Sequence, residues 1–216
     1  MRLGTYFRKE LLNKINIKSN SSDVVLDVGC FDGYWLSTQK AKQKYGLDID
    51  IVKKYKNIKY IKASALDIPF PKNKFDRVFA FDVIEHVPEN TEIKFLSELI
   101  RVTKPGGEIV ITCPSNKIRI FPQFLTEFAS KKWQHFKYPG LSRNNLTKYL
   151  SKFKEIRYDI SDLNTKYFLQ LYLMLSLLWR LNPNLTKKLI LFLLDKELQS
   201  LRGNNGYYII KIRRIK

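Results

Sequence analysis

The stretch VVLDVGCFDGYWL (Val24–Leu36) runs from an apolar, β-branched segment into a turn that holds two glycines. Continuous apolar runs of this kind are typical of strands in parallel sheets that are covered on both faces. Asp27 interrupts the run, and a carboxylate there needs polar partners. Gly29 and Gly33 permit a tight turn and a close approach of the backbone to a ligand. A helix over residues 34–39 would direct free backbone N–H groups at the same spot, so the stretch predicts a nucleotide-like ligand. An ordinary turn that binds nothing is the alternative.

Strands and helices alternate along the residues that follow. The helical spacing of apolar residues in EIKFLSELIRV (92–102) predicts an amphipathic helix, which KPGG ends. The connection between residues 50 and 57 is too short for a normal crossover helix. The rhythm predicts a doubly wound, mostly parallel α/β sheet. The further expected strands are KYGLDID (44–50), NIKYIKA (57–63), FDRVFAFDVIEHV (75–87) and EIVITCP (108–114), and the inward helical residues are Ile93, Leu96, Leu99 and Ile100.

The second half of the chain contains an unusually long connection. KFKEIRYDIS (152–161) and GYYIIKIRR (206–214) are expected to be the sixth and last strands, and about 45 residues separate them where a hairpin needs only a handful. YFLQLYLMLSLLWRL (167–181) and LTKKLILFLL (185–194) are apolar nearly all round, yet neither reaches the roughly 18 to 20 residues that span a bilayer. Four interpretations stay open: core helices, a hydrophobic lid, a dimer interface, or a hairpin in a membrane interface. In the last case the residues at head-group level would be Trp179, Arg180, Lys187 and Lys188.

Composition narrows the class of protein. The chain has 216 residues, of which 44% are hydrophobic, and this favours one domain with a sizeable core. Cys30 and Cys113 are the two cysteines, so a reduced, cytoplasmic protein is expected rather than a disulfide scaffold. MRLGTYFRKELL (1–12) lacks the apolar run of a secretory signal and predicts a short amphipathic helix. Its inward residues would be Leu3, Tyr6, Phe7, Leu11 and Leu12.

The net charge of +19 is unevenly distributed. Residues 1–113 hold 19 basic and 14 acidic side chains, whereas residues 114–216 hold 20 basic and 6 acidic ones. The second half should therefore attract an anionic partner: a phospholipid surface, a phosphorylated substrate or a nucleic acid. A lysine-rich, solvated surface is the alternative. Nucleic-acid binding would also use aromatic residues between lysines, as in KKWQHFKY (131–138).

Four stretches, in order, place glycines and acids beside apolar runs. They are VVLDVGCFDGYWL (24–36), GLDID (46–50), ASALDIPFPKNKFDRVFAFDVIEHV (63–87) and LSELIRVTKPGGEIVITCPSN (96–116). This succession resembles the motifs of class I S-adenosylmethionine-dependent methyltransferases, in the subgroup of ubiquinone-type and sugar or lipid O-methyltransferases. The resemblance is specific because several motifs occur in the right order. It implies a Rossmann-like, seven-stranded sheet with an antiparallel last strand, and S-adenosyl-L-methionine as the cofactor.

The resemblance also implies a set of cofactor-binding residues. The glycine turn with Asp27 would hold the methionine part, and Asp48 would bind both ribose hydroxyls, a role that suits a carboxylate facing a vicinal diol. Ser64, where members usually have aspartate, and the N–H of Ala65 would contact adenine. Phe31 stands where members usually have glycine, and it would either crowd the cofactor or pack beneath the first helix. The full set is Asp27, Gly29, Cys30, Phe31, Gly33, Asp48, Ile49, Ser64, Ala65 and Phe81.

Methyl transfer asks the protein mainly to hold a nucleophile in line with the methyl group, with a base when that nucleophile is a hydroxyl. His86 and His135 are the two histidines, and an unperturbed imidazole titrates near neutrality. Asp82 and Glu85 are further candidates for a base or an orienting group. A packed His86 and a surface His135 without a catalytic role are the alternatives. Spacing does not indicate a dedicated metal site, although the adjacent Glu85 and His86 leave one open.

The sequence thus predicts a single methyltransferase domain that moves a methyl group to a hydroxyl, and less readily to an amine or carboxylate, of a small or lipid- or glycan-linked acceptor. RNA methylation and a catalytically silent binding protein are the alternatives. We expect a cytoplasmic protein that associates peripherally with an anionic membrane. Its expected parts are a lead-in (1–22), a cofactor-binding core (23–116), a substrate-covering region with the sixth strand (117–160), an apolar helical insertion (161–205), and the last strand with a basic tail (206–216).

Overall fold

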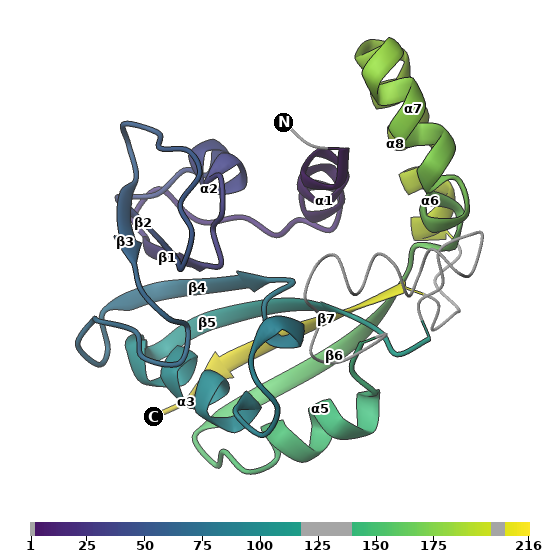
Figure 1. The fold of residues 1–216 in the computed structure, drawn as a ribbon. Helices are drawn as coiled ribbons and strands as arrows, with labels where there is room; N and C mark the ends of the chain where they lie inside the picture. The colour runs from purple at the N-terminus through teal and green to yellow at the C-terminus, as the bar shows by residue number, and fades with distance from the viewer. Residues whose placement is uncertain (1–2, 118–139, 200–205) are drawn as a thin grey trace.

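A seven-stranded sheet forms the centre of the molecule in the computed structural model, which describes residues 3–117, 140–199 and 206–216 (Figure 1). The strand order is β3-β2-β1-β4-β5-β7-β6. Neighbouring strands pair in parallel from β3 to β5, whereas β7 is antiparallel to both β5 and β6. The predicted fold is confirmed. The strands are β1 (Val24–Val28), β2 (Gln43–Asp48), β3 (Lys59–Lys62), β4 (Phe75–Phe81), β5 (Thr103–Pro114), β6 (Ile156–Asn164) and β7 (Gly206–Arg214).

Helices cover both faces of the sheet (Figure 1). On one face lie α1 (Leu3–Lys14), α2 (Tyr34–Thr38), α6 (Lys166–Gln170), α7 (Tyr172–Leu181) and α8 (Pro183–Gln199). On the other lie α3 (Glu92–Val102) and α5 (Arg143–Leu150), and the short helix η1 (Ile84–His86) follows β4. The described residues contain no helix that is both long and apolar enough to cross a membrane. As expected, residues 50–57 contain no crossover helix.

The second half of strand β4, residues 78–81, is apolar at every position. Side chains alternate between the two faces of a strand. Phe79 and Phe81 belong to the core under α1, α2 and α6–α8, whereas Val78 and Ala80 belong to the core under α3 and α5. Trp35 of α2 packs edge-on against both phenylalanines, with ring centroids 4.6 and 4.7 Å apart. Because both faces are buried from Val78 to Phe81, this part of the strand needs apolar residues at every position, whereas Asp76 and Arg77 lie in its half-buried first part.

Several expected boundaries were wrong. The strands expected over residues 44–50 and 57–63 are Gln43–Asp48 and Lys59–Lys62. The strand expected over residues 75–87 ends at Phe81, because Asp82 adopts a left-handed backbone conformation with φ 55° and η1 follows. The strand expected from residue 108 begins at Thr103, and the sixth strand is shifted to Ile156–Asn164. In α3, Phe95 is fully buried while Ile93 is only half-buried. The local pattern does not contain the tertiary contacts that decide these points.

Helix α1 fills the space between the sheet and the α6–α8 segment. All five residues that the sequence predicts to face inward are buried: Leu3, Tyr6, Phe7, Leu11 and Leu12. Phe7 stacks on Phe168 of α6 with ring centroids 3.6 Å apart, and Tyr6 lies 5.4 Å from the ring of Trp179 in α7. Lys14 forms a salt bridge with Asp195 of α8. Helix α1 thereby fixes the α6–α8 segment on this face.

Candidate functional site

The glycine turn lies at the carboxyl end of β1, where it is tied to the end of β2. The N–H groups of Gly29 and Cys30 donate to the carbonyl of Leu47 at 2.7 and 3.2 Å. Gly29 and Gly33 have φ values of 74° and 62°, which side chains with a Cβ rarely adopt. The predicted strand, turn and helix are therefore present. Open α/β sheets bind ligands at this edge.

Both glycines are also required by packing. A Cβ atom on Gly29 would lie 2.4 Å from Cγ2 of Val83, and one on Gly33 would lie 2.2 Å from the hydroxyl of Tyr60. Neither neighbour was expected from the sequence. The contact between Gly29 and Val83 brings the segment after β4 directly against the turn, so the candidate bases in that segment lie beside it.

Replacing Gly29 with alanine should lower the free energy of unfolding by about 2–4 kcal/mol, since it combines an unfavourable φ with a clash. Gly106→Ala is the matched control, because Gly106 has φ 78° and nothing within 4 Å of its missing Cβ. That control should lose only about 1–2 kcal/mol. The double variant Gly29→Ala/Val83→Ala should recover part of the difference in urea denaturation. Equal losses for the two single variants would contradict the steric argument.

Asp48 joins three strand ends at the same edge. Its Oδ2 accepts the N–H of Phe31 at 2.7 Å, and its Oδ1 accepts the N–H of Asp50 at 2.9 Å. Its own carbonyl accepts the N–H of Ala63 at 3.1 Å, at the end of β3. Each carboxylate oxygen keeps a further lone pair. Ile49, the next residue, is 69% exposed and presents an apolar surface beside the carboxylate.

The other expected adenine contacts lie after β3. Ser64 is exposed, and its hydroxyl accepts the N–H of Leu66 at 3.1 Å. Ala65 is half-buried next to it. The Ser64 hydroxyl thus shapes the loop, and the loop follows directly from the strand that pairs with Asp48.

Asp27 is a buried acid beneath the turn, 5% exposed. Burial raises the pKa of Asp27 to about 8, the charges of Asp48 and Asp32 raise it further, and Arg8 of α1 opposes them. An acid with this pKa is mostly protonated at neutral pH. A cation bound nearby would favour its ionised form, so the site can respond to the charge of a ligand.

The three remaining expected cofactor residues have different surroundings. Phe31 is half-buried and has φ 47°. Residues with a Cβ atom rarely adopt this left-handed conformation, so glycine would suit the position better. Cys30 is buried, and burial raises the pKa of its thiol. Phe81 is buried against Trp35, and its carbonyl accepts Nη1 of Arg8 at 3.3 Å. The side chains of Cys30 and Phe81 therefore serve the core.

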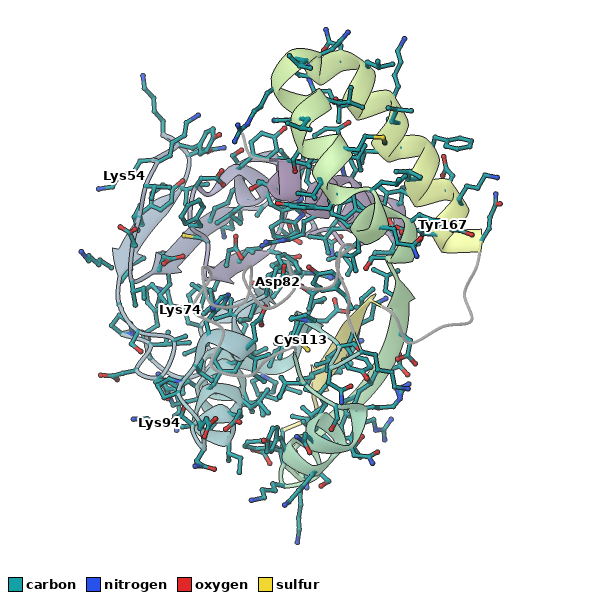
Figure 2. The ribbon with its side chains drawn as sticks, turned by 45° about the vertical axis from the view of Figure 1, so that its right-hand side comes forward. Lys54, Lys74, Asp82, Lys94, Cys113 and Tyr167 are labelled. Carbon is teal, nitrogen blue, oxygen red and sulfur yellow. The ribbon has the colours of Figure 1, made fainter. Side chains whose placement is uncertain are left out.

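A charged pair that the sequence did not reveal lies at the end of β4. Nη2 of Arg8 lies 3.1 Å from Oδ2 of Asp82, and the hydroxyl of Thr112 donates to Oδ1 at 2.8 Å. Figure 2 shows Asp82 near the middle of the molecule, below the helical hairpin at the top of the view. The tip of Tyr207 is close enough that Asp82 and burial both raise its pKa. Arg8 lies 74 positions from Asp82 in the sequence, so no local pattern links them.

The structure places three of the four candidate bases in one short segment after β4. Asp82 is held by Arg8 and Thr112, and Glu85 is buried to 1% exposure. His86 is half-buried at the end of η1, where its N–H donates to the carbonyl of Val83 at 2.9 Å. His86 thus lies within one turn of the residue that packs on Gly29. His135, together with the basic and aromatic residues 131–138, lies outside the described residues.

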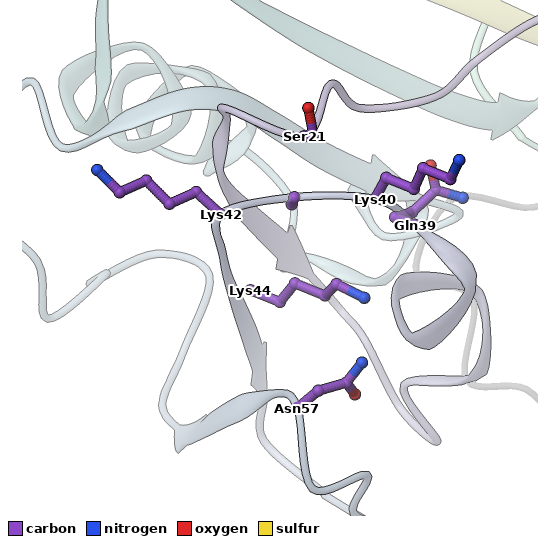
Figure 3. Close-up of a pocket in the computed structure, with 7 residues that line it drawn as sticks. Ser21, Gln39, Lys40, Lys42, Lys44 and Asn57 are labelled. Carbon is purple, nitrogen blue, oxygen red and sulfur yellow. The ribbon is translucent and has the colours of Figure 1, made fainter.

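A hollow of about 400 Å³ lies at the opposite, amino edge of the sheet (Figure 3). It is formed where the chain enters the strands β1, β2 and β3, and it is basic. Because ligands of this fold class bind at the carboxyl edge, the hollow is separate from the candidate site. Its lining residues are Ser21, Gln39, Lys40, Ala41, Lys42, Lys44 and Asn57.

The family described as a methyltransferase domain matches residues 26–111, which include the glycine turn, Asp48 and the segment after β4. Over these residues the chain is similar to methyltransferase domains, and its relatives include S-adenosylmethionine-dependent methyltransferases. The chain is 32% identical over 106 residues to a probable S-adenosylmethionine-dependent methyltransferase of Mycolicibacterium smegmatis, covering 45% of this chain and 40% of that protein. It is 33% identical over 118 residues to a demethylmenaquinone methyltransferase of Staphylococcus saprophyticus, covering 48% and 49%.

The methyltransferase fold extends beyond the matched residues. The structure of Haemonchus contortus phosphoethanolamine N-methyltransferase 2 in complex with S-adenosyl-L-methionine superposes with a TM-score of 0.66 at 17% identity. The superposition covers 96% of this chain and 52% of that chain, and it shows the shared fold. The chain thus spans about half the length, or less, of the curated relatives described above.

Proposed function

We propose that this protein transfers a methyl group from S-adenosylmethionine to a hydroxyl of a small or lipid- or glycan-linked acceptor. One observation carries the proposal. The hydrogen bond from the N–H of Phe31 to Oδ2 of Asp48 joins the glycine turn to the acid of β2, at the carboxyl edge of the methyltransferase domain. The two halves of a nucleotide-type site thereby meet in one place.

The residues present at this edge fit the cofactor. The free lone pairs of Asp48 would accept the ribose hydroxyls, and an adenine ring would cover the exposed side chain of Ile49. The ammonium of the methionine part would be held at the glycine turn, where its charge would favour ionisation of Asp27, and the resulting carboxylate would compensate that charge. The bound cofactor would supply an already activated methyl group on its sulfonium sulfur.

The protein's own part in the reaction would be positioning and proton removal. A hydroxyl acceptor must lose its proton as it attacks, and a neutral imidazole can take that proton. We assign this role to His86, because it follows Val83 and Val83 packs on the glycine turn. Asp82 is already engaged with Arg8 and Thr112, and Glu85 is buried.

The choice of a lipid-like acceptor is supported by the place of the helical insertion. The β6 end Asn164 pairs with Gly206 of β7, and Tyr207 pairs with Pro114 at the end of β5. The chain therefore leaves and re-enters the sheet at the carboxyl edge, on the side of the candidate site. A segment rich in exposed leucines at this edge suits an apolar acceptor better than an RNA, which needs cationic and stacking surfaces.

Asp48→Ala should weaken the binding of S-adenosylhomocysteine by at least about tenfold, since it removes charge-assisted hydrogen bonds to the ribose. Isothermal titration calorimetry measures this directly. Asp50→Ala is the control, because it removes an exposed acid two residues away and leaves the Asp48 carboxylate in place. Thermal unfolding should show that both variants are folded. A wild-type protein that binds neither S-adenosylmethionine nor S-adenosylhomocysteine at millimolar concentration would overturn the proposed function.

A further inference from the structure

The two long helices of the insertion form a hairpin that projects from the sheet (Figure 1). Helix α7 ends at Leu181 and α8 begins at Pro183, with Asn182 between them as a cap. The turn lies far from the sheet, and large apolar side chains are exposed around it. Leu177 is 63% and Leu181 is 81% exposed. The exposed set on the hairpin is Leu173, Met174, Leu177, Leu181, Leu185 and Phe192.

Helix α8 has a buried stripe and an exposed stripe, whereas α7 has one fully buried residue, Leu175, and an exposed stripe. In α8 the residues Thr186, Ile190, Leu194 and Glu197 are buried. Leu185, Lys188, Phe192 and Lys196 are exposed and recur at spacings of three and four, so they share another face. In α7, Leu173, Leu177 and Leu181 recur every four residues and form the exposed stripe. The hairpin therefore packs one side against the core and leaves an apolar side exposed.

The exposed stripes carry positive charge next to the apolar residues. Arg180 in α7 and Lys188 in α8 are exposed, and Nζ of Lys196 lies 5.4 Å from the ring centroid of Phe192. The two acids of the described hairpin do not balance this charge: Asp195 is paired with Lys14, and Glu197 is buried. The outward face of the hairpin is thus apolar and cationic.

We propose that the α7–α8 hairpin docks the protein on an anionic phospholipid membrane, with the exposed leucines among the upper acyl chains and the basic residues at the head groups. Apolar burial and attraction to anionic lipid together are what hold an amphipathic helix in a membrane interface. Long basic side chains can extend to the head groups while their stems stay in the apolar layer.

Charge decides between this occupant and a second copy of the chain. A symmetric dimer through the hairpin would place Arg180 and Lys188 of each copy against the same cations of the other. An anionic lipid surface instead pairs each of them with a phosphate. Since the insertion starts and ends at the carboxyl edge, docking would also turn the candidate site toward the membrane.

The test is cosedimentation of the full chain with vesicles of phosphatidylcholine alone, and of phosphatidylcholine with one quarter phosphatidylglycerol. The wild type should bind the anionic vesicles, and bind more weakly at 0.5 M than at 0.1 M salt. Leu177→Ser/Leu181→Ser should reduce the partition coefficient at least about tenfold. Ile215→Ser is the control, because Ile215 is 44% exposed at the other end of the molecule and should leave binding unchanged.

A second pair of variants tests the charge. Arg180→Gln/Lys188→Gln should lose about tenfold in binding to anionic vesicles at 0.1 M salt. Lys152→Gln/Lys154→Gln removes two exposed cations near the start of β6 and should lose much less. Circular dichroism and binding of S-adenosylhomocysteine show that each variant is folded, and neither readout requires an acceptor.

Three results would overturn the proposal. The first is a wild type that does not bind anionic vesicles, and the second is a leucine variant that binds as well as the wild type. The third is an equal loss of vesicle binding in the two charge variants, which would indicate diffuse attraction. Sedimentation equilibrium adds a fourth: a wild-type dimer that dissociates in the leucine variant would assign the hairpin to contacts between copies. Vesicle binding and cofactor binding are separate measurements, so failure of one leaves the other proposal standing.

Discussion

Replacing His86 with alanine is expected to reduce the turnover of an acceptor hydroxyl by about 10²- to 10⁴-fold, while cofactor affinity changes little. The reason is geometric. His86 ends the short helix after β4, and Val83 at the start of that segment packs on Gly29, whereas the ribose acid Asp48 lies at the end of β2. The variant should therefore lose a proton acceptor and keep the binding site.

The measurement compares single-turnover rates of His86→Ala, His135→Ala and Asp82→Asn at saturating cofactor. Protonation of a general base at low pH lowers the reaction rate. The fall of the rate on the acid side of the wild-type pH profile should therefore disappear in the variant that lacks the base. Asp82→Asn leaves Arg8 without its carboxylate partner and should disturb acceptor placement more than the pH profile. Full activity of both histidine variants would contradict the assignment and leave Asp82, Glu85 or positioning alone.

Asp27→Asn is expected to stabilise the free protein at high pH and to weaken cofactor binding. The pKa of this acid is about 8 in the folded protein and near 3.8 when exposed. Between these values the folded state holds a proton that the unfolded chain has released, so the free energy of unfolding falls as pH rises through this range. An amide has no proton to lose. The variant should gain about 1–3 kcal/mol over the wild type at pH 8.5, and less at pH 5.5.

Asp27→Asn should weaken cofactor binding, although it stabilises the free protein. A cationic ligand favours the ionised carboxyl, so wild-type binding at pH 7 should release a proton and strengthen from pH 6 to 8. Calorimetry in buffers with different ionisation enthalpies counts that proton. In Asp27→Asn the proton release should vanish and affinity should fall at least about tenfold. Asp67→Asn, an exposed acid, is the control. Unchanged proton release in Asp27→Asn would show that another group is responsible.

Much of the fold was predictable because its elements satisfy strong local patterns. The buried face of α1 and the bounds of β7 were predicted residue for residue, since amphipathic spacing and a β-branched run leave few alternatives. The glycine turn was predicted from two closely spaced glycines after an apolar run, and in the structure both adopt positive φ values of 74° and 62°. The role of Asp48 at the end of β2 was expected from the resemblance to methyltransferases, and the structure shows that this acid is bonded to the turn.

The remaining features depend on partners that are distant in the sequence. Arg8 reaches Asp82 only after α1 has packed over β4. The steric need for glycine at position 29 arises only where the ends of β1 and β4 meet, because Val83 then fills the space of a Cβ atom. The insertion is the clearest case. Its two apolar segments gave no inner face by periodicity, and the structure divides them into a buried and an exposed stripe through contacts with α1 and the sheet. Helix packing, not composition, made that division.

The position of α1 has a consequence for biosynthesis. Its rings meet Phe168 and Trp179, and Lys14 meets Asp195, so its partners are translated more than 150 residues later. Contacts of such long range form slowly, because a large loop must close before they stabilise anything. Until these partners are synthesised, α1 can pack only on α2 and the sheet, and the apolar side chains that later meet α6–α8 stay exposed to chaperones. Packing of α1 against α6–α8 therefore cannot be completed before residues 166–199 have been synthesised.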